Sequence, residues 1–435
     1  MLVLLKCRLS LQRQLKTASR DVWTRHNDRV KVCLGIEDID RQVDAVWKEF
    51  TADYRSSEEI EAALWTEFPL KHGGDGVRVV DMIVRAAAPA SLLRNGLVEL
   101  SLERTWNRRL KSNALDSAGI FGRMMNRYDS LGAPRVLQVL DGLAEILLLA
   151  VIAHYLLYPP TMPVLSDDLR QYGSREYTII IFAVAMLARP WTIKMLSPLL
   201  VVLAFLLSMP SWPSFSTMQL AFATQLISIH LPSPSSPFLF IPPRLSLPLM
   251  VLIKRSIFLI FTPIVLFYLP AILLAAILLS LSLADTSLNL NPILDYSTTS
   301  PMGSRITFIT LFGILALLLL LALVTGAAAL PSLCKADLPS TSYESTWDAY
   351  GPRIGLCARE EFVRTLVWYS TPCYFPPPFN ILQIFISGGP SALWILAGYQ
   401  QPHKGLHTLE KFVWRVTVGP LVTLVAIIWL WNLRY

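Results

Sequence analysis

Two long uncharged runs, Ser256 to Ala284 and Ile306 to Leu330, dominate the hydropathy pattern of the chain. A stretch of about 18 or more apolar residues is long enough to cross the hydrocarbon core of a bilayer as a helix. The connection between them, Asp285 to Arg305, carries Asp285 and Asp295 and contains no Lys or Arg before its last residue. The pattern therefore predicts two membrane-spanning helices joined by an acidic loop.

Four shorter apolar segments precede this pair, and they complete a predicted six-span domain over residues 136–332. If the N-terminal region lies in the cytosol, the Lys and Arg residues between the spans fall mainly on the cytosolic side, as the positive-inside rule requires. The four segments are Val136–Tyr158, Tyr177–Ala188, Met195–Met209 and Ser216–Ile229.

Residues 1–135 are rich in charge and show a helical rather than a membrane pattern. Apolar residues recur every three or four positions at Ile39, Val43, Val46, Trp47 and Phe50, which is the period of an amphipathic helix. Acidic residues that follow a pair of serines then indicate a helix start at residues 56–59. We expect a helical cytosolic N-terminal domain.

The C-terminal region, residues 333–435, contains two further apolar segments, Phe379–Gly398 and Val416–Trp431. Each is either a membrane span or a helix that lies at the membrane interface, and periodicity does not decide between these alternatives. Taken together, the chain is predicted to be an all-α polytopic membrane protein.

The composition limits the classes of function. Charged residues make up 16% of the chain, against roughly 25% in a typical soluble domain, so the net charge of +7 is read as Lys and Arg flanking the spans. We expect the lipid bilayer, and not nucleic acid, as the partner of this surface. The five cysteines contain no CxxC pair, and no HExxH, GxSxG, P-loop or GxGxxG motif is present. These absences predict a protein that is not an enzyme and that needs no metal or cofactor.

Asp141 and Glu145 lie four residues apart on the first predicted span, and therefore on one face of the helix. Ionisable groups inside a span are costly and usually face a bundle interior or an aqueous path. One interpretation is an ion or proton site. The other is a pair of carboxylates near the cytosolic interface that bind Arg135 or Arg189.

Asp285 and Asp295 are the candidate residues of an ion pathway, because acidic side chains at a pore mouth concentrate cations. The alternative is an ordinary polar loop that happens to contain two acids.

One segment has the character of a known family. After the sixth predicted span, a charged helix at residues 358–369 is followed by Tyr374-Phe375-Pro376-Pro377-Pro378-Phe379-Asn380. This order resembles the region just past the last pore helix of TRP-type cation channels, and most of all the fungal vacuolar TRP-like calcium channel family. The resemblance implies that Pro377, Pro378, Phe379 and Asn380 form an elbow that turns the chain back beneath the membrane.

The resemblance further implies a TRP-like six-helix bundle, a homotetramer, conduction of cations including calcium, and a vacuolar or other internal membrane. Two features depart from the family pattern: Gln383 stands near the position of an acidic residue, and the polar stretch Ser297–Ser304 stands where the family has a pore helix and filter. Three functions therefore remain open. They are a TRP-like cation channel, a diverged pore-less scaffold or accessory protein, and a membrane enzyme or transporter that uses Asp141 and Glu145.

Overall fold

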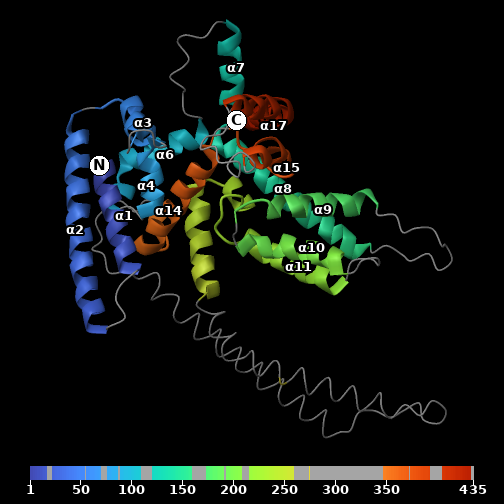
Figure 1. Ribbon diagram of the computed structural model, residues 1–435, viewed down its shortest axis with the longest axis horizontal. Coiled ribbons are helices and arrows are strands. Elements are labelled where there is room, and N and C mark those ends of the chain that lie inside the picture. The colour runs from blue at the N-terminus through green and yellow to red at the C-terminus, as the bar shows by residue number, and fades with distance from the viewer. Residues whose placement is uncertain are drawn as a thin grey trace, which may run out of the picture. The chain divides into compact units, whose positions relative to one another are not determined.

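The computed structural model describes residues 1–16, 22–53, 55–69, 76–86, 89–108, 120–158, 173–190, 193–207, 215–258, 274, 346–371, 373–391 and 404–432. The chain divides into two compact units, one formed by Met1–Leu247 with Leu356–Tyr435 and the other by Pro248–Gly355. Helices predominate in these residues (Figure 1), which confirms the all-α class. The only strands among them, β1 (Phe68–Pro69) and β2 (Gly76–Val77), form one antiparallel pair.

The N-terminal helices pack around a small apolar core. Helix α1 (Leu2–Lys16) contacts α2 (Val22–Ala52) and α4 (Val79–Ala86), and Leu5 is fully buried. Val43 and Trp47 of the predicted apolar face are buried, whereas Val46 is 38% exposed. Buried residues four positions apart lie on one side of a helix, so α2 packs against its neighbours with this side.

Local capping chemistry sets several helix starts in this region. The Ser56 side chain accepts the backbone N–H of Glu59 and begins α3 (Ser57–Trp65), as the sequence predicts. The Asn95 side chain likewise accepts the N–H of Leu97 and begins α6 (Gly96–Asn107), which follows the short α5 (Ala90–Leu93). Helix α6 in turn contacts α8 (Pro134–Leu157), the first long apolar helix.

The next helices correspond to the first four predicted spans. After α7 (Ile120–Ser130), α8 starts with proline at its first position, where the missing N–H costs nothing. A 3-10 turn, η2 (Ile193–Met195), separates the second and third helices, and η3 (Pro237–Phe240) follows the fourth. The four helices are α8 (Pro134–Leu157), α9 (Ser174–Leu187), α10 (Leu196–Leu207) and α11 (Phe215–Ile229).

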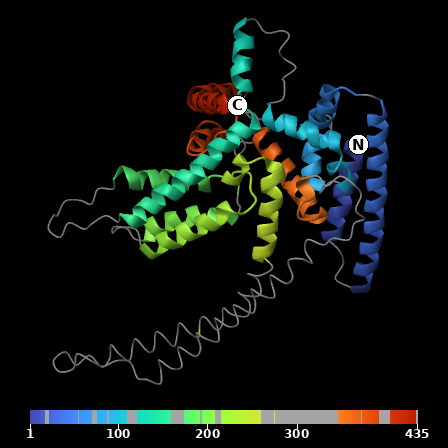
Figure 2. The ribbon, with the colours of Figure 1, turned by 180° about the vertical axis from the view of Figure 1, so that it is seen from behind.

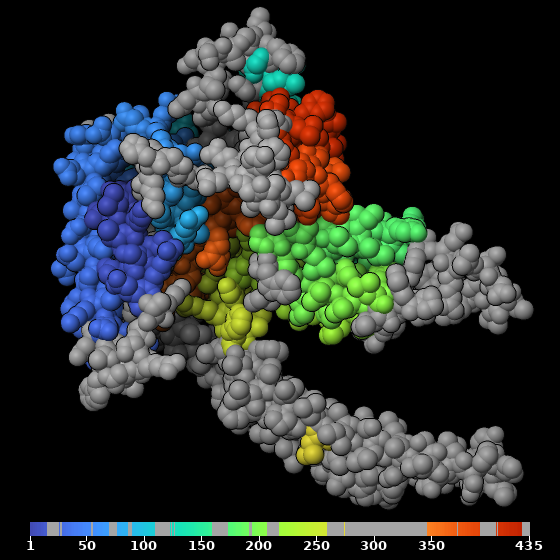
Figure 3. All heavy atoms as spheres, in the orientation of Figure 1, coloured from blue at the N-terminus to red at the C-terminus, as the bar shows by residue number. Residues whose placement is uncertain are grey.

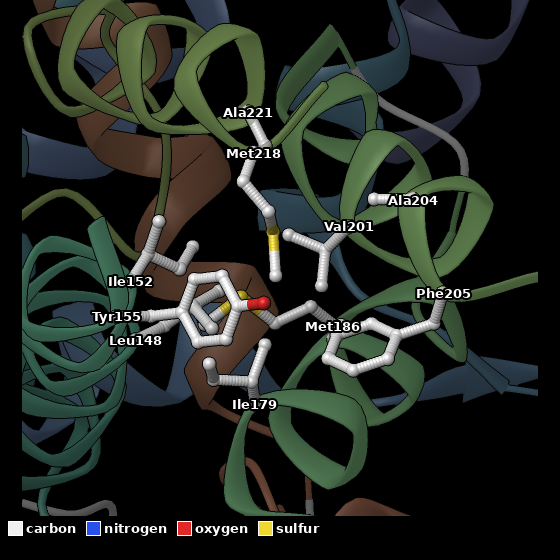
Figure 4. Close-up of a cluster of buried hydrophobic side chains, with 11 residues drawn as sticks. Leu148, Ile152, Tyr155, Ile179, Met186, Val201, Ala204, Phe205, Met218 and Ala221 are labelled. Atoms are coloured by element: carbon white, nitrogen blue, oxygen red, sulfur yellow. The ribbon is translucent and has the colours of Figure 1, made fainter. Parts of the chain in front are cut away.

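Helices α8 to α11 form a four-helix bundle with a continuous apolar core. Figure 4 shows Tyr155 of α8, Ile179 of α9, Phe205 of α10 and Met218 of α11 pointing toward one another, and all four are buried. The outward faces of the same helices are apolar too, with exposed Leu147, Ile181, Leu206 and Leu220. Helices that are apolar on both sides are typical of a bundle surrounded by lipid.

Within the described residues, two helices are long and apolar enough to cross a membrane: α8 and the segment Thr408–Ile428. Helices α10 and α11 are apolar but shorter. Of the predicted fifth and sixth spans, Ser256–Ala284 and Ile306–Leu330, only residues 256–258 and 274 belong to the described part of the chain, and these are helical. The two candidate helices are compatible with membrane association, and the full six-span bundle stays a prediction.

The C-terminal region returns to the first unit. Helix α14 (Pro352–Tyr369) buries Phe362 edge-on against Trp106 of α6. Short helices α15 (Asn380–Gln383) and η5, a π turn at Ile384–Gly388, occupy part of the predicted apolar segment Phe379–Gly398. The last helix, α17 (Lys404–Asn432), contacts α7, α8 and η5. Figure 2 shows the same arrangement from behind.

Candidate functional site

Asp141 is the centre of a buried polar cluster at one end of the four-helix bundle. Its side chain is fully buried, and its Oδ1 atom lies 2.7 Å from Nη2 of Arg189, which follows α9. The hydroxyls of Tyr369, the last residue of α14, and of Tyr374 both donate to Oδ2 of the same carboxylate. One carboxylate thus connects α8, the end of α9, the end of α14 and the segment that leads into the predicted elbow.

The cluster is internally satisfied, which is what makes a buried charge tolerable. An isolated carboxylate in an apolar interior would carry a desolvation penalty of several kcal/mol, and that penalty is offset only by good geometry and by further hydrogen bonds. Arg189 also donates to the hydroxyl of Tyr374, at 2.9 Å, and Trp368 donates to the same hydroxyl, at 3.3 Å. Asp141 therefore has its counter-charge and two neutral donors.

The protonation states follow from burial and from Asp141. Burial lowers the pKa of Arg189, but the carboxylate of Asp141 outweighs burial and holds this pKa above its ordinary value. Burial raises the pKa of Tyr369, and the carboxylate of Asp141 raises it further. Burial also raises the pKa of Tyr374, while Arg189 lowers it and Asp141 raises it again, which leaves it above its ordinary value. Arg189 is therefore a cation, and both phenols are neutral donors.

Glu145, one turn further along α8, forms a second buried ion pair. Nζ of Lys194, in η2, lies 3.0 and 2.9 Å from its two carboxylate oxygens, and the hydroxyl of Ser235 donates to Oε1. Asp141 and Glu145 thus bind two different basic side chains, both from the connection between α9 and α10. Of the two partners considered for Asp141, Arg189 is the one present, whereas Arg135 donates to Asn107.

Gln138 extends this polar stripe of α8 by one turn in the other direction. Its amide nitrogen donates to the backbone carbonyl of Ser236, at 2.8 Å, and the side chain is fully buried. Between these polar residues, Gly142 allows η3 to approach, because a Cβ at this position would lie 2.7 Å from the ring of Phe240. The three polar residues therefore bind the connection between α9 and α10 and the segment that follows α11.

A small cavity of about 90 Å³ adjoins Glu145. Its lining includes Arg189, Lys194, Gln225 and Trp368, and Asp141 does not belong to it. A space of this size suits a few water molecules. Of the two acids, Glu145 lines this cavity and Asp141 does not. Among the described residues there is no group of three or more His, Cys, Asp or Glu side chains able to hold a metal ion.

The predicted elbow, Pro377, Pro378, Phe379 and Asn380, is attached directly to the bundle. The amide nitrogen of Asn380 donates to the backbone carbonyl of Ala185, in α9. The indole N–H of Trp414, in α17, donates to the carbonyl of Tyr374, at 2.8 Å. The peptide bond between Pro377 and Pro378 is cis.

A second and larger cavity, about 420 Å³, lies beside the elbow. Arg189, Trp368, Tyr374, Asn380 and Gln383 contribute to its lining. Gln383, the residue that stands near an acidic position of the family pattern, donates to Oε1 of Glu410 in α17, at 2.7 Å. The elbow thus has an acidic neighbour that comes from another helix.

Asp285 and Asp295 lie outside the described residues, so their role as an ion pathway stays a prediction. Sequence reasoning missed Tyr369, Tyr374, Ser235 and Gln138 as members of the cluster. The sequence did indicate the basic partners, because the separation between Arg189 and Lys194 is close to that between Asp141 and Glu145. No local sequence pattern indicates the two tyrosines.

Comparison with known proteins finds no family model that matches the chain and no match among the curated proteins.

Proposed function

We propose that the chain is a multi-pass membrane protein of TRP-like design that conducts cations, with calcium as the ion that the resemblance suggests. The observation that carries the proposal is the Asp141 cluster. It joins the four-helix bundle to the end of α14 and to the residues that enter the Pro377–Asn380 elbow, through Arg189, Tyr369 and Tyr374.

Surface character supports a membrane setting for the bundle. Large apolar side chains are exposed along α8 at Leu143, Ile146 and Leu147, although the core side of the same helix is well packed. In water, such a surface would be an association or aggregation hazard. In a bilayer it is the expected lipid-facing side of a span.

The connectivity supports a coupling role for the cluster. Helix α14 follows the predicted sixth span in the chain, so a movement of the bundle that displaces Asp141 would pull on the end of α14 through Tyr369. Coupling between sites needs a contiguous physical link with discrete arrangements. A buried, satisfied ion pair with two additional donors provides the contiguous part of such a link, because breaking one partner is costly.

In this proposal Asp285 and Asp295 attract cations to the pore mouth, and four copies of the chain surround the pore. The membrane is an internal one, and the family resemblance suggests that of the vacuole. The N-terminal domain lies on its cytosolic side. The competing proposal, a pore-less scaffold or accessory protein, is favoured by the stretch Ser297–Ser304, whose polar sequence does not predict an apolar pore helix.

The test is a patch-clamp recording on enlarged vacuoles that express the chain, with calcium varied on the cytosolic face. A cation current that falls when Asp285 and Asp295 are both replaced by Asn supports the channel. A protein shown to be present in that membrane but without any current favours the pore-less alternative.

A further inference from the structure

Helix α17 has two apolar faces, one of which is buried and the other exposed in the described part of the chain. Its inner face buries residues spaced four apart: Trp414, Val418, Val422 and Ala426. Its outer face exposes a second apolar stripe, and Figure 3 shows the red atoms of α17 at the surface. The exposed members of this outer stripe are Leu409, Phe412, Val416, Leu424, Ile427 and Ile428.

The first half of α17 is fixed beside α7 by ionic and steric contacts. Arg415 forms a two-pronged ion pair with Asp129, at 2.9 and 2.6 Å, and Lys411 lies 3.2 Å from the same carboxylate. The hydroxyl of Tyr128 donates to the carbonyl of Arg415, and the absence of a side chain at Gly419 admits the ring of Tyr128. Because α8 begins only a few residues after Asp129, this part of α17 lies near the N-terminal end of α8.

The direction of α17 differs from that of the bundle helices. In Figure 1, α17 is seen almost end-on, whereas α8 to α11 lie lengthwise in the view, and Figure 2 agrees. Helices α17 and α8 are also in contact. Two helices that cross steeply cannot both run along the bilayer normal, so if α8 spans the membrane, α17 does not.

We infer that α17 lies in the plane of the membrane, on the side where α8 begins, with its outer stripe against lipid acyl chains. This inference rests on the proposed function, because it requires α8 to span. It assigns the interfacial alternative to the predicted segment Val416–Trp431.

The distribution of charge along α17 identifies lipid as the occupant of the outer stripe. Lys404, Lys411 and Arg415 all precede residue 416, and no charged residue follows in the helix. The stripe from Leu409 to Ile428 is about 28 Å long at 1.5 Å per residue. Lys411 and Arg415 are engaged by Asp129, so the outer stripe itself is uncharged, and an apolar helix face of this kind is buried at the boundary between headgroups and acyl chains.

The test compares three engineered cysteines in an otherwise cysteine-free chain: Ser130→Cys at the end of α7, Ser174→Cys at the start of α9, and Asn432→Cys at the end of α17. Sealed vesicles are treated with a maleimide that does not cross membranes. Ser130→Cys and Ser174→Cys mark the two sides of α8, because Arg175 binds the carbonyl of Tyr158 just beyond its far end. An in-plane α17 predicts that Asn432→Cys is labelled together with Ser130→Cys.

Labelling of Asn432→Cys together with Ser174→Cys would overturn the inference and leave the proposed function intact. Release of the protein by alkaline carbonate, with all three cysteines equally accessible, would instead overturn the proposed membrane function. The test can be repeated without removing the natural cysteines, by adding a protease site after Tyr435. Protease should then cleave this site from the side of the membrane on which Ser130 lies.

Membrane depth provides a second measurement. Spin labels at Val416 and Ile427, both exposed on the outer stripe, should report similar shallow depths if α17 lies in the plane. A label at Ile427 that is much deeper than one at Val416, or that emerges on the opposite side, would contradict the in-plane position. If the maleimide reaches Asn432→Cys from neither side, the spin-label depths still distinguish an in-plane α17 from a spanning one.

Discussion

Asp141 is bound by residues that are distant from it in sequence, and its environment accounts for the behaviour expected of each partner. The carboxylate has no access to water and depends on Arg189 for its counter-charge. Removing one member of a buried ion pair leaves the other charge uncompensated, which is the costly outcome.

Asp141→Asn is therefore expected to lower the free energy of unfolding by about 3–5 kcal/mol, since Arg189 stays charged while only 16% of its side chain is exposed. Thermal unfolding of the detergent-purified protein measures this. The matched control removes both charges, as Asp141→Leu with Arg189→Met, and should be less destabilised than the single variant. A single variant as stable as the natural protein would contradict the role given to Asp141.

Tyr374→Phe removes one donor to Asp141 and keeps the ring, which lies edge-on against Tyr369 with centroids 4.9 Å apart. A hydrogen bond to a charged group contributes about 1.5–3 kcal/mol, and we expect a loss of stability in that range. Tyr158→Phe, at an exposed position, is the control and should change the unfolding temperature little. Equal effects of the two substitutions would show that the hydroxyl of Tyr374 is not engaged as described.

At the scale of elements, close approach of helices depends on particular glycines. Gly142 on α8 allows the ring of Phe240 in η3 to lie against the helix, and Gly419 does the same for Tyr128. In contrast, a Cβ at Gly96, at the start of α6, would meet nothing within 4 Å.

Gly142→Ala should therefore destabilise the packing of η3 on α8 by about 1–3 kcal/mol, as overpacking does. Gly96→Ala is the matched control and should be neutral or slightly stabilising, because it reduces the freedom of the unfolded chain. Chemical denaturation of both variants in the same detergent compares them. If the two substitutions have the same effect, the contact between Gly142 and Phe240 does not constrain the helix.

The attachment of α17 should depend on pH through Asp129. Burial raises the pKa of its carboxyl, but hydrogen bonds from Arg415 and Lys411 outweigh burial and hold this pKa below its ordinary value. The stabilising contribution is complete above the unfolded-state pKa of about 3.9 and is lost as the pH falls through the lower folded-state pKa.

Hydrogen exchange at the backbone amides of α17 should accordingly be slow at pH 5 and faster, after correction for intrinsic rates, as the pH falls below 4. Asp129→Asn should already show the faster exchange at pH 5 and little further change. Protection that is the same in both proteins at every pH would exclude Asp129 as the anchor.

Helix positions were largely predictable from the sequence, whereas the contacts between helices were not. The expected second span, Tyr177–Ala188, corresponds to α9 at Ser174–Leu187, and the helix start predicted at residues 56–59 corresponds to the start of α3, because both depend on neighbouring residues. The bond from Tyr374 to Asp141 joins residues 233 positions apart, and no local pattern indicates it.

Across the whole molecule, a few polar groups connect the bundle, the elbow and α17. Asp141 binds the end of α14 and the approach to the elbow, Asn380 binds α9, and Trp414 binds the carbonyl of Tyr374. These contacts link the segments on either side of the predicted fifth and sixth spans. A protein built this way would transmit a displacement of the bundle to the residues that follow the predicted pore.

The most direct test of the proposed conduction uses the purified chain alone in planar lipid bilayers, with single-channel currents recorded in asymmetric potassium and calcium solutions. Discrete cation-selective openings are expected, and the double replacement of Asp285→Asn with Asp295→Asn should reduce their amplitude. The control, Tyr158→Phe, should conduct as the natural chain does. Intact, correctly inserted protein that never opens, over a range of voltage and calcium, would contradict the channel and leave the pore-less accessory protein in its place.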